Sequence, residues 1–348
     1  MKTAVVICPG RGTYNAGELG YLARHFPDPR LLSAFDAQRM AAGQETLSAL
    51  DTAERFSPAK HTRGDNASGL IFAASYGDYL SIDRERVEIV AVTGNSMGWY
   101  SALACGGALS PQDGFRVANT MGTLMQQALI GGQLIHPWMG EDWVPDLARK
   151  RDLLDLAARI GAQPDRQLHL SIDIGGMLVL AGDSAGLQAF EQSVEPAQQR
   201  FPMRLPNHAA FHTPMQGPVA EQGRQRLDRA LFGQPDTPLV DGNGRIWWPG
   251  SSDPQALYDY TLGAQVTQPY DFTRAVTVAA REFAPELFII LGPGTTLGGA
   301  VAQSLIVADW RQMRGRGDFR REQDATGLLA AMGMADQRGA VAKAERRQ

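Results

Sequence analysis

A predicted strand passes directly into a predicted helix through Val90-Ala91-Val92-Thr93-Gly94-Asn95-Ser96-Met97-Gly98-Trp99-Tyr100-Ser101-Ala102-Leu103. This segment contains the pattern Gly-x-Ser-x-Gly at Gly94, Ser96 and Gly98. In a nucleophile elbow the serine occupies a sharp, strained turn, so the residues two positions before and after it must be small. The helix that follows directs its N-terminal N–H groups at the reaction centre, where its dipole favours developing negative charge. The segment therefore predicts that Ser96 is a catalytic nucleophile.

Short apolar runs alternate with longer helical patterns on both sides of this segment. Most of these runs are continuously apolar, as expected for strands of a parallel sheet that helices cover on both faces. The clearest of them are residues 4–8, 88–93, 177–181 and 287–291. The alternation predicts an α/β fold.

Residues 131–206 depart from this pattern, because their predicted order is helix, strand, strand, helix, strand. Gly175-Gly176 separates the predicted strands 168–174 and 177–181, which is a hairpin signal. We therefore expect a small α+β subdomain here, inserted into a larger α/β body.

The domain organisation that follows has three parts. The large α/β domain is expected to be discontinuous and to comprise residues 1–130 and 207–310. Residues 311–348 carry nine Lys and Arg against five Asp and Glu, and we expect them to form a charged C-terminal extension.

Composition excludes several classes of protein. A formal net charge of −4 argues against a nucleic-acid binder, because phosphate contacts need an excess of Lys and Arg. Two cysteines are too few for a disulfide scaffold or a cysteine-based zinc site. No apolar run is long enough to span a membrane, and the run Ala4–Cys8 is too short for a signal peptide. We expect a cytoplasmic protein without a membrane or nucleic-acid partner.

A serine nucleophile needs a base, and the chain has six histidines. His208 and His212 lie in a proline-flanked loop that enters a helix, a place where functional residues are often presented. Spacing alone does not choose between them. Two glycine turns are further candidates for the site. They follow the first and last predicted strands, at Pro9–Thr13 and Gly292–Gly294. The first turn could place a backbone N–H in an oxyanion hole.

The serine elbow, the histidine loop and the two glycine turns together resemble the malonyl-CoA:acyl-carrier-protein transacylase family, which includes acyltransferase domains of polyketide synthases. The family motifs are Phe-Pro-Gly-Gln-Gly-Ser, Gly-His-Ser-Leu-Gly-Glu, Phe-His-Ser/Thr-Pro and Gly-Pro-Gly. The matching segments of this chain, in the same order, are Cys8–Thr13, Gly94–Trp99, Phe211–Pro214 and Gly292–Gly294. The resemblance implies an α/β-hydrolase-like large domain with a parallel sheet and an inserted, ferredoxin-like small subdomain.

The resemblance also implies a mechanism. His212 matches the catalytic histidine, so it would form a dyad with Ser96, and a backbone carbonyl would orient its imidazole. Backbone N–H groups of Arg11 and Met97 would form the oxyanion hole. Acyl transfer would follow a ping-pong course from an acyl thioester, CoA- or carrier-bound, to an acyl carrier protein. The phosphopantetheine belongs to CoA or the partner, so no metal or cofactor is expected, and we expect a monomer.

Three departures from the family pattern concern the acyl group. Malonyl-specific members carry an arginine about 25 residues after the serine, and the matching residue here is Met121. A thioether cannot pair with a carboxylate, and burying an unpaired acid costs several kcal/mol. Asn95 and Trp99 replace the family histidine and glutamate. With Phe211, these residues predict an apolar acyl pocket and a non-carboxylated acyl group, in polyketide or fatty-acid-like biosynthesis.

Alternative functions remain open. A thioester hydrolase that removes acyl groups from carrier proteins would use the same residues with water as the acceptor. A docking protein of reduced catalytic activity is motivated by the changes at Arg11, Asn95 and Trp99. An ordinary α/β-hydrolase esterase fits poorly, because its histidine would lie near the C-terminus and no histidine follows His212.

Overall fold

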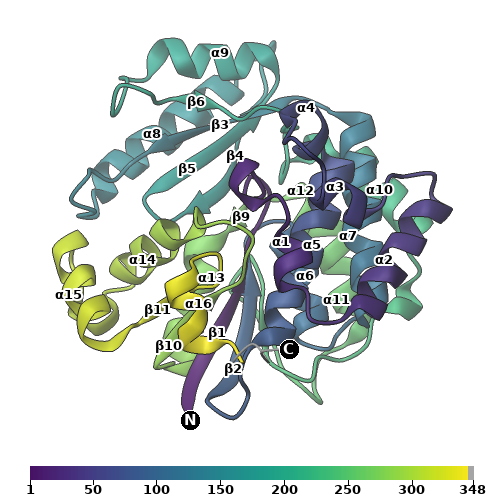
Figure 1. Ribbon diagram of the computed structural model, residues 1–348. Coiled ribbons are helices and arrows are strands. Elements are labelled where there is room, and N and C mark those ends of the chain that lie inside the picture. The colour runs from purple at the N-terminus through teal and green to yellow at the C-terminus, as the bar shows by residue number, and fades with distance from the viewer. Residues whose placement is uncertain (344–348) are drawn as a thin grey trace.

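A computed structural model describes residues 1–343 and shows two sheets (Figure 1). The larger sheet has the strand order β11-β10-β1-β2-β7-β8. Its strands are β1 (Lys2–Cys8), β2 (Val87–Gly94), β7 (Leu239–Val240), β8 (Ile246–Trp247), β10 (Leu287–Ile290) and β11 (Leu329–Ala331). All neighbouring strands are parallel except β7 and β8. The predicted α/β class with a parallel sheet is confirmed.

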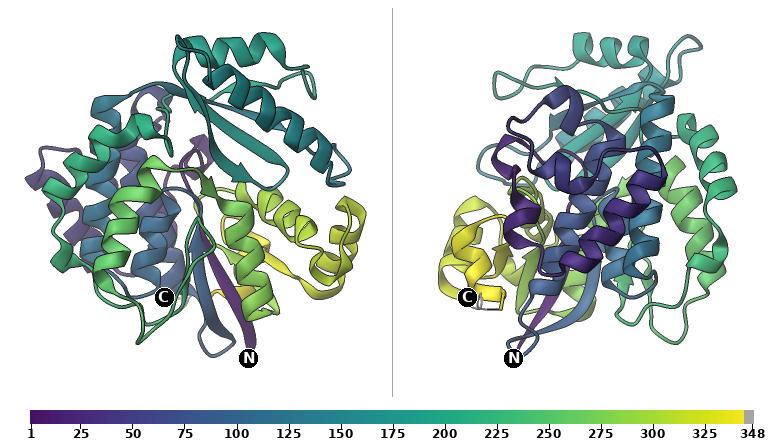
Figure 2. Two further views of the ribbon diagram at one scale, coloured as in Figure 1. Left: turned by 180° about the vertical axis from the view of Figure 1, so that it is seen from behind. Right: turned by 45° about the vertical axis from the view of Figure 1, so that its right-hand side comes forward.

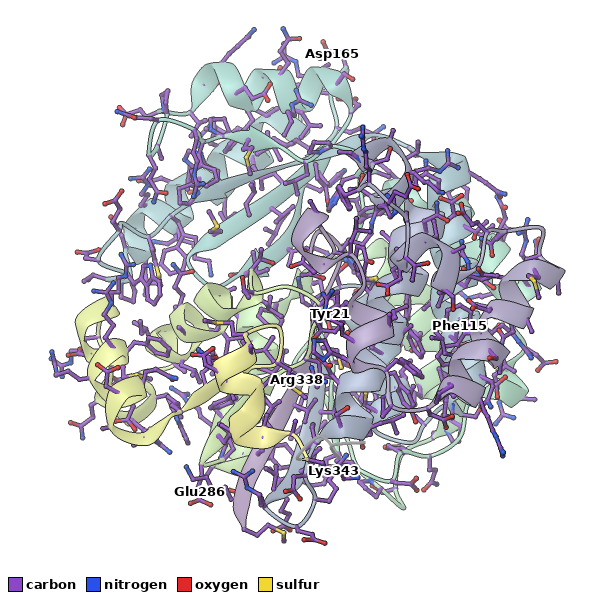
Figure 3. All side chains as sticks on the ribbon, in the orientation of Figure 1. Tyr21, Phe115, Asp165, Glu286, Arg338 and Lys343 are labelled. Carbon is purple, nitrogen blue, oxygen red and sulfur yellow. The ribbon has the colours of Figure 1, made fainter. Side chains whose placement is uncertain are left out.

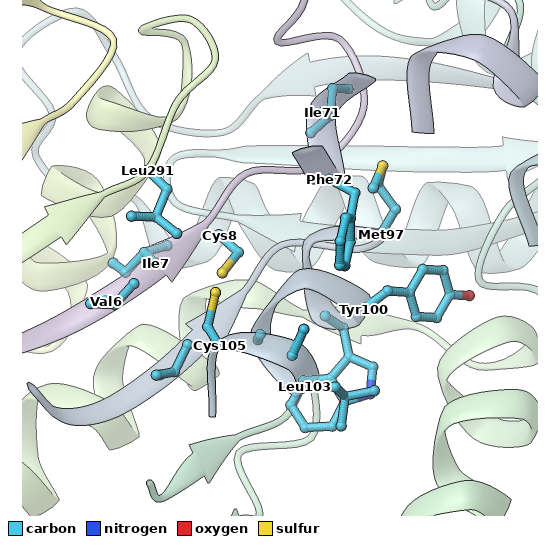
Figure 4. Close-up of a cluster of buried hydrophobic side chains, with 14 of the residues drawn as sticks. Val6, Ile7, Cys8, Ile71, Phe72, Met97, Tyr100, Leu103, Cys105 and Leu291 are labelled. Carbon is cyan, nitrogen blue, oxygen red and sulfur yellow. The ribbon is translucent and has the colours of Figure 1, made fainter. Parts of the chain in front are cut away.

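Helices cover the large sheet on both sides, so its central strands are buried (Figure 2). Residues Ala4–Cys8 of β1 are fully buried, which explains their continuous apolar run. The main covering helices are α5 (Gly64–Ser81), α6 (Gly98–Cys105), α7 (Pro111–Ala128), α10 (Gly217–Arg226), α13 (Phe272–Phe283) and α14 (Leu297–Val307). Cys8 of β1 and Cys105 of α6 lie side by side as free thiols, with their sulfur atoms turned toward one another (Figure 4).

Further helices join these elements around the large sheet. They are α1 (Tyr21–His25), α2 (Pro29–Ala41), α3 (Leu47–Asp51), α4 (Pro58–His61), α11 (Pro254–Asp259) and α12 (Gln265–Thr267). No helix among residues 1–343 combines the length and the apolar character that crossing a bilayer requires.

The second sheet lies above the first in Figure 1 and belongs to the predicted insert. Its elements follow the order β3 (Gly132–Pro137), α8 (Leu147–Gly161), β4 (Leu168–Ile174), β5 (Met177–Gly182), α9 (Ser184–Ser193) and β6 (Met203–Arg204). The strand order β6-β3-β5-β4 with antiparallel pairing is ferredoxin-like, as the resemblance implies. A short strand of the large domain, β9 (Tyr270–Asp271), extends this sheet beside β4, so the two sheets are tied together.

Two features of the fold differ from expectation. Strand β3 was not predicted, because Gln133 and His136 interrupt its apolar pattern; both side chains are nevertheless buried. Residues 311–343 do not form a separate extension, because β11 pairs with β10 at the edge of the large sheet. The helices α15 (Arg316–Thr326) and α16 (Ala335–Val341) flank β11. Residues 344–348 of the predicted extension lie outside the described part.

A buried ion pair attaches the C-terminal part to the body. Arg338 of α16 pairs with Asp78 of α5, whose side chain is fully buried. The Asp78 carboxylate also accepts a hydrogen bond of 2.7 Å from the Tyr21 hydroxyl and another of 2.7 Å from the Gly292 N–H. Tyr21 and Arg338 lie close together in Figure 3. The pair therefore links the last helix to the glycine turn at Gly292.

Replacing Arg338 with methionine leaves Asp78 buried without its cationic partner. Removing one partner of a buried ion pair costs about 3–5 kcal/mol, so Arg338→Met should lower the free energy of unfolding by about that amount in a urea titration. Arg320→Met on α15 is the matched control, because Arg320 is exposed. Equal effects of the two substitutions would contradict the role given to the pair.

Candidate active site

Ser96 occupies a strained turn between β2 and α6. Its φ of 56° lies in the left-handed region, which a non-glycine residue adopts at a cost. Both flanking glycines are required by close backbone approaches. A Cβ on Gly94 would lie 2.3 Å from the carbonyl oxygen of Gly98, and a Cβ on Gly98 would lie 2.2 Å from that of Cys8. The turn thus has the geometry that the elbow pattern predicts.

His212 supplies the base that faces Ser96. Its Nε2 lies 2.7 Å from the Ser96 Oγ. The other candidate of the same loop, His208, is turned away and bonds through Nδ1 to the side-chain oxygen of Gln133 at 2.8 Å. The structure therefore places His212, and not His208, in position to accept the serine proton.

A backbone carbonyl orients the imidazole of His212. Its Nδ1 lies 2.6 Å from the carbonyl oxygen of Gln265. Because a carbonyl only accepts, Nδ1 carries the proton and Nε2 is the acceptor for the serine hydroxyl. The Gln265 side chain is itself held, since it accepts a hydrogen bond from the Tyr100 hydroxyl and donates to the Ser96 carbonyl, both at 3.1 Å. Sequence reasoning did not assign Gln265, because a backbone carbonyl leaves no side-chain signature.

Burial keeps His212 neutral. Its removal from water lowers the pKa of His212 to about 4, and the bond to the Gln265 carbonyl raises it by a smaller amount. An ordinary histidine has a pKa near 6.5. At neutral pH the imidazole is therefore unprotonated and able to accept a proton.

The two residues predicted to supply the oxyanion hole line the cavity that contains Ser96. β1 and β2 are parallel neighbours that end together, with Cys8 paired to Gly94. The loops that follow bring Arg11 and Met97 to one small cavity with Ser96 and His212. Hydrogen bonds among the described residues use neither the Arg11 nor the Met97 N–H. Both donors are free to stabilise an oxyanion.

The residues predicted to form the acyl pocket do not line one common cavity. The cavity at Ser96 has a volume of about 20 Å³, and Phe211 forms part of its wall. Asn95 instead lines a second, larger cavity. Further residues of the small cavity, which the sequence did not single out, are Ser68, Tyr100, Gly122 and Met125.

Met121 and Trp99 do not line either cavity, so their assignment to the acyl pocket is corrected. On α7 the cavity is lined by Gly122 and Met125, and Met121 is not among its lining residues. The sulfur of Met121 packs against Gly223 of α10. Trp99 is fully buried beneath the elbow, and its indole N–H donates to the Thr261 hydroxyl at 3.0 Å.

The Arg11 side chain borders both cavities. Its Nη2 donates to the carbonyl oxygens of Thr62 at 2.7 Å and Asn207 at 3.1 Å, and its guanidinium lies over the Phe211 ring. Its Nε is buried without a partner among the described residues. Burial lowers the pKa of Arg11 to about 10, partly opposed by the nearby Asp65. The side chain therefore bridges the two loops above the serine and stays charged at neutral pH.

The larger cavity has a volume of about 920 Å³ and lies between the two sheets. Its walls come from the loop after β1, from β3, β4 and β5 of the small domain, and from α14. His208 and Gln133 also line it, near the end where Arg11 stands. A cavity of this size is in the range of small-molecule binding sites.

Comparison by sequence finds malonyl CoA-acyl carrier protein transacylases. The protein of this name from Salmonella typhimurium is 22% identical over 302 residues, which cover 86% of this chain and 92% of that protein. A phenolphthiocerol synthesis type I polyketide synthase from Mycobacterium marinum is 26% identical over 328 residues, which cover 88% of this chain and 14% of that protein. No protein-family model matches the chain.

Comparison by structure finds the same kind of protein. The malonyl-CoA:acyl carrier protein transacylase of Xanthomonas oryzae has a TM-score of 0.74 at 20% identity, with 99% of each chain covered. A malonyl-transacylase solved in complex with a type II polyketide synthase acyl-carrier protein has a TM-score of 0.72 at 19% identity, with 98% of each chain covered. The predicted combination of a large α/β domain and a small subdomain is therefore confirmed.

The low pKa of His212 predicts an unusual pH profile. Because only the neutral imidazole accepts the serine proton, acylation of Ser96 should stay constant from pH 7 to about pH 5 and fall as the pH drops through about 4. Rapid-quench acylation rates on folded protein, checked by circular dichroism at each pH, provide the measurement. A midpoint near 6.5 would show that His212 titrates as an exposed histidine.

Proposed function

We propose that the chain is a member of the malonyl-CoA:acyl-carrier-protein transacylase family and that it transfers acyl groups between thioesters through an acyl-Ser96 intermediate. The observation that carries this proposal is the continuous hydrogen-bonded series from Ser96 Oγ to His212 and on to the Gln265 carbonyl. Arg11 and Met97 line the same cavity, and no hydrogen bond among the described residues uses their backbone N–H groups, which leaves both as donors for the proposed oxyanion hole. An intact arrangement of this kind argues against a docking protein of reduced activity.

Transfer proceeds in two half-reactions. His212 Nε2 accepts the Ser96 proton while Oγ attacks the thioester carbon, and the oxyanion is held by the N–H groups of Arg11 and Met97. Collapse of the tetrahedral intermediate breaks the C–S bond, and the imidazolium returns its proton to the departing thiolate. A second thiol then attacks acyl-Ser96 by the reverse steps. These steps require no metal or redox group of the protein's own.

The acceptor in this proposal is the phosphopantetheine thiol of an acyl carrier protein, in polyketide or fatty-acid-like biosynthesis. The relatives named for this reaction support the assignment. Arg200 and Arg316 are exposed residues lining the larger cavity, and neither forms a salt bridge among the described residues. They offer positive charge to an acidic carrier or to its phosphate. A cytoplasmic location and a monomeric state stay predictions.

The acyl group is proposed to be non-carboxylated. Helix α7 presents Gly122 and Met125 to the serine cavity, so it supplies no cation there. Arg11 is the charged side chain that reaches this cavity, and its Nη2 already donates to two carbonyls. Acylation by a malonyl thioester should therefore be compared with acylation by uncharged acyl thioesters. Of these acyl groups, only the carboxylated one could form an ion pair with the remaining donors of Arg11.

Hydrolysis of the acyl-serine is a second candidate, favoured by one observation. The cavity of about 20 Å³ beside His212 has room for one water molecule. A water there could receive general-base assistance from His212 and release a free acid. The two functions share the first half-reaction and differ only in the acceptor.

Incubation with acetyl-, octanoyl- and malonyl-CoA should distinguish the acyl groups. Intact-mass spectrometry should show one acyl adduct on the wild-type chain with the uncharged acyl groups, and none on Ser96→Ala. Faster labelling by malonyl-CoA would overturn the non-carboxylated assignment and identify Arg11 as its cation. The absence of an adduct with every thioester would contradict the proposed function itself.

Carrier-protein mass spectrometry separates transfer from hydrolysis. An acyl-carrier protein and a second, unacylated carrier are incubated together with the chain. Transfer predicts that the acyl mass appears on the second carrier, and hydrolysis predicts free acid and two unacylated carriers. Ser96→Ala is the control for spontaneous thioester loss.

A further inference from the structure

We propose that the apolar arm of the larger cavity, formed by Met139, Ile174, Met177, Leu297 and Ala300, is an acyl-chain site. The thioesters processed at Ser96 are then those of medium-length or long aliphatic acids. This inference rests on the proposed function, because it requires an acyl group attached to Ser96.

The cavity at Ser96 leaves no room for a chain. Its volume of about 20 Å³ holds little more than one water molecule. Tyr100, Met125 and Phe211 form its walls, and Arg11 is held in place by the Thr62 and Asn207 carbonyls. An alkyl chain attached to the ester carbon must therefore leave in another direction.

The larger cavity provides that direction. It begins next to the nucleophile, because Asn95 and Arg11 line it, and Arg11 also lines the cavity that contains Ser96. Its volume of about 920 Å³ is at the upper end of the usual range for ligand pockets. There is space for a chain in addition to the pantetheine arm.

The two ends of this cavity differ in chemistry. Thr62 and Asn207, which are hydrogen-bonded to each other and to Arg11, line one part and offer the hydrogen-bonding groups that the two amides of a pantetheine arm need. The apolar arm is lined mainly by thioethers and aliphatic side chains, which match an alkyl chain, and the side-chain oxygen of Gln303 beside them already accepts the Gly176 N–H.

The charged residues near the apolar arm, Glu141 and Arg316, are exposed, so they lie at its rim. Burial of methylene groups against the interior side chains would provide the driving force for binding.

The β4–β5 hairpin forms a fixed wall of the apolar arm. The N–H of Gly176 donates to the side-chain oxygen of Gln303 on α14 at 3.0 Å, and the N–H of Gly175 donates to the Thr273 hydroxyl at 2.8 Å. A Cβ on Gly175 would lie 2.7 Å from the carbonyl oxygen of Ala300. This tight contact between the small domain and α14 limits the space, so it predicts an upper limit on chain length.

Gly299 of α14 offers a direct way to fill this space. It lines the cavity, and a Cβ placed on it would meet no atom within 4 Å. A leucine there would therefore enter the cavity from a Cβ that meets no neighbour. Gly339 of α16 is the matched control, since a Cβ there also meets no atom within 4 Å and Gly339 does not line the cavity.

The test measures acylation of Ser96 by N-acetylcysteamine thioesters of acids from two to twelve carbons. We expect kcat/KM of the wild-type chain to rise at least about tenfold from acetyl to octanoyl, the order that burying several methylenes supplies. Gly299→Leu should lower the octanoyl and dodecanoyl values about tenfold and leave the acetyl value unchanged. Gly339→Leu, and the smaller change Gly299→Ala, should behave as the wild type.

Other outcomes overturn the proposal in recognisable ways. Acylation of Ser96 at equal rates for all chain lengths would remove the acyl-chain site and leave the proposed function standing. Acetyl-CoA carries the full pantetheine arm, whereas an N-acetylcysteamine thioester carries only its end. A lower kcat/KM of Gly299→Leu for acetyl-CoA, with an unchanged kcat/KM for octanoyl-N-acetylcysteamine, would show that the arm holds pantetheine instead. The absence of acylation by every thioester would contradict the proposed function and this inference together.

Discussion

The contact between Gly98 and the carbonyl of Cys8 is the constraint on which the site depends. A side chain at Gly98 would meet this oxygen at 2.2 Å, so only glycine lets the start of α6 approach the end of β1. This approach brings Arg11 and Met97 to the same cavity. The oxyanion hole that we propose would therefore result from the packing of two parallel strands and one helix, and would need no dedicated side chain.

The small domain holds the loop that carries His212. A series of hydrogen bonds runs from the His208 ring to Gln133 of β3, from Gln133 to Ser171 of β4, and from the Ser171 hydroxyl to the Phe211 carbonyl at 2.7 Å. Burial lowers the pKa of His208 to about 3, so it stays neutral in this series. Insertion of the small domain thus fixes the position of the base relative to the serine, and it also forms one wall of the larger cavity.

The sequence predicts the features that depend on local chemistry. The apolar run Ala4–Cys8 and the glycines around Ser96 identify the central strand and the elbow, because burial on both faces and close backbone approach each require specific residue types. The family resemblance selects His212 over His208, and the structure brings His212 to Ser96. The sequence does not reveal the Gln265 carbonyl, because every residue has one.

Features that depend on tertiary packing were predicted less well. Position 121 matches the family arginine in the sequence, yet α7 lines the serine cavity with Gly122 and Met125, and the sulfur of Met121 packs against Gly223 of α10 instead. The charged composition of residues 311–348 suggested an extension, but three buried residues, Leu329–Ala331, are enough to join the sheet. In both cases the packing partner, and not the local composition, decides the outcome.

The central claim is that Ser96 becomes acylated before any acceptor thiol takes part. A stopped-flow assay of free thiol, with an acyl thioester and no acceptor, tests it most directly. The account predicts a rapid burst of one thiol per chain, followed by slow release, and no burst from Ser96→Ala. A linear release without a burst, or an equal burst from Ser96→Ala, would contradict it.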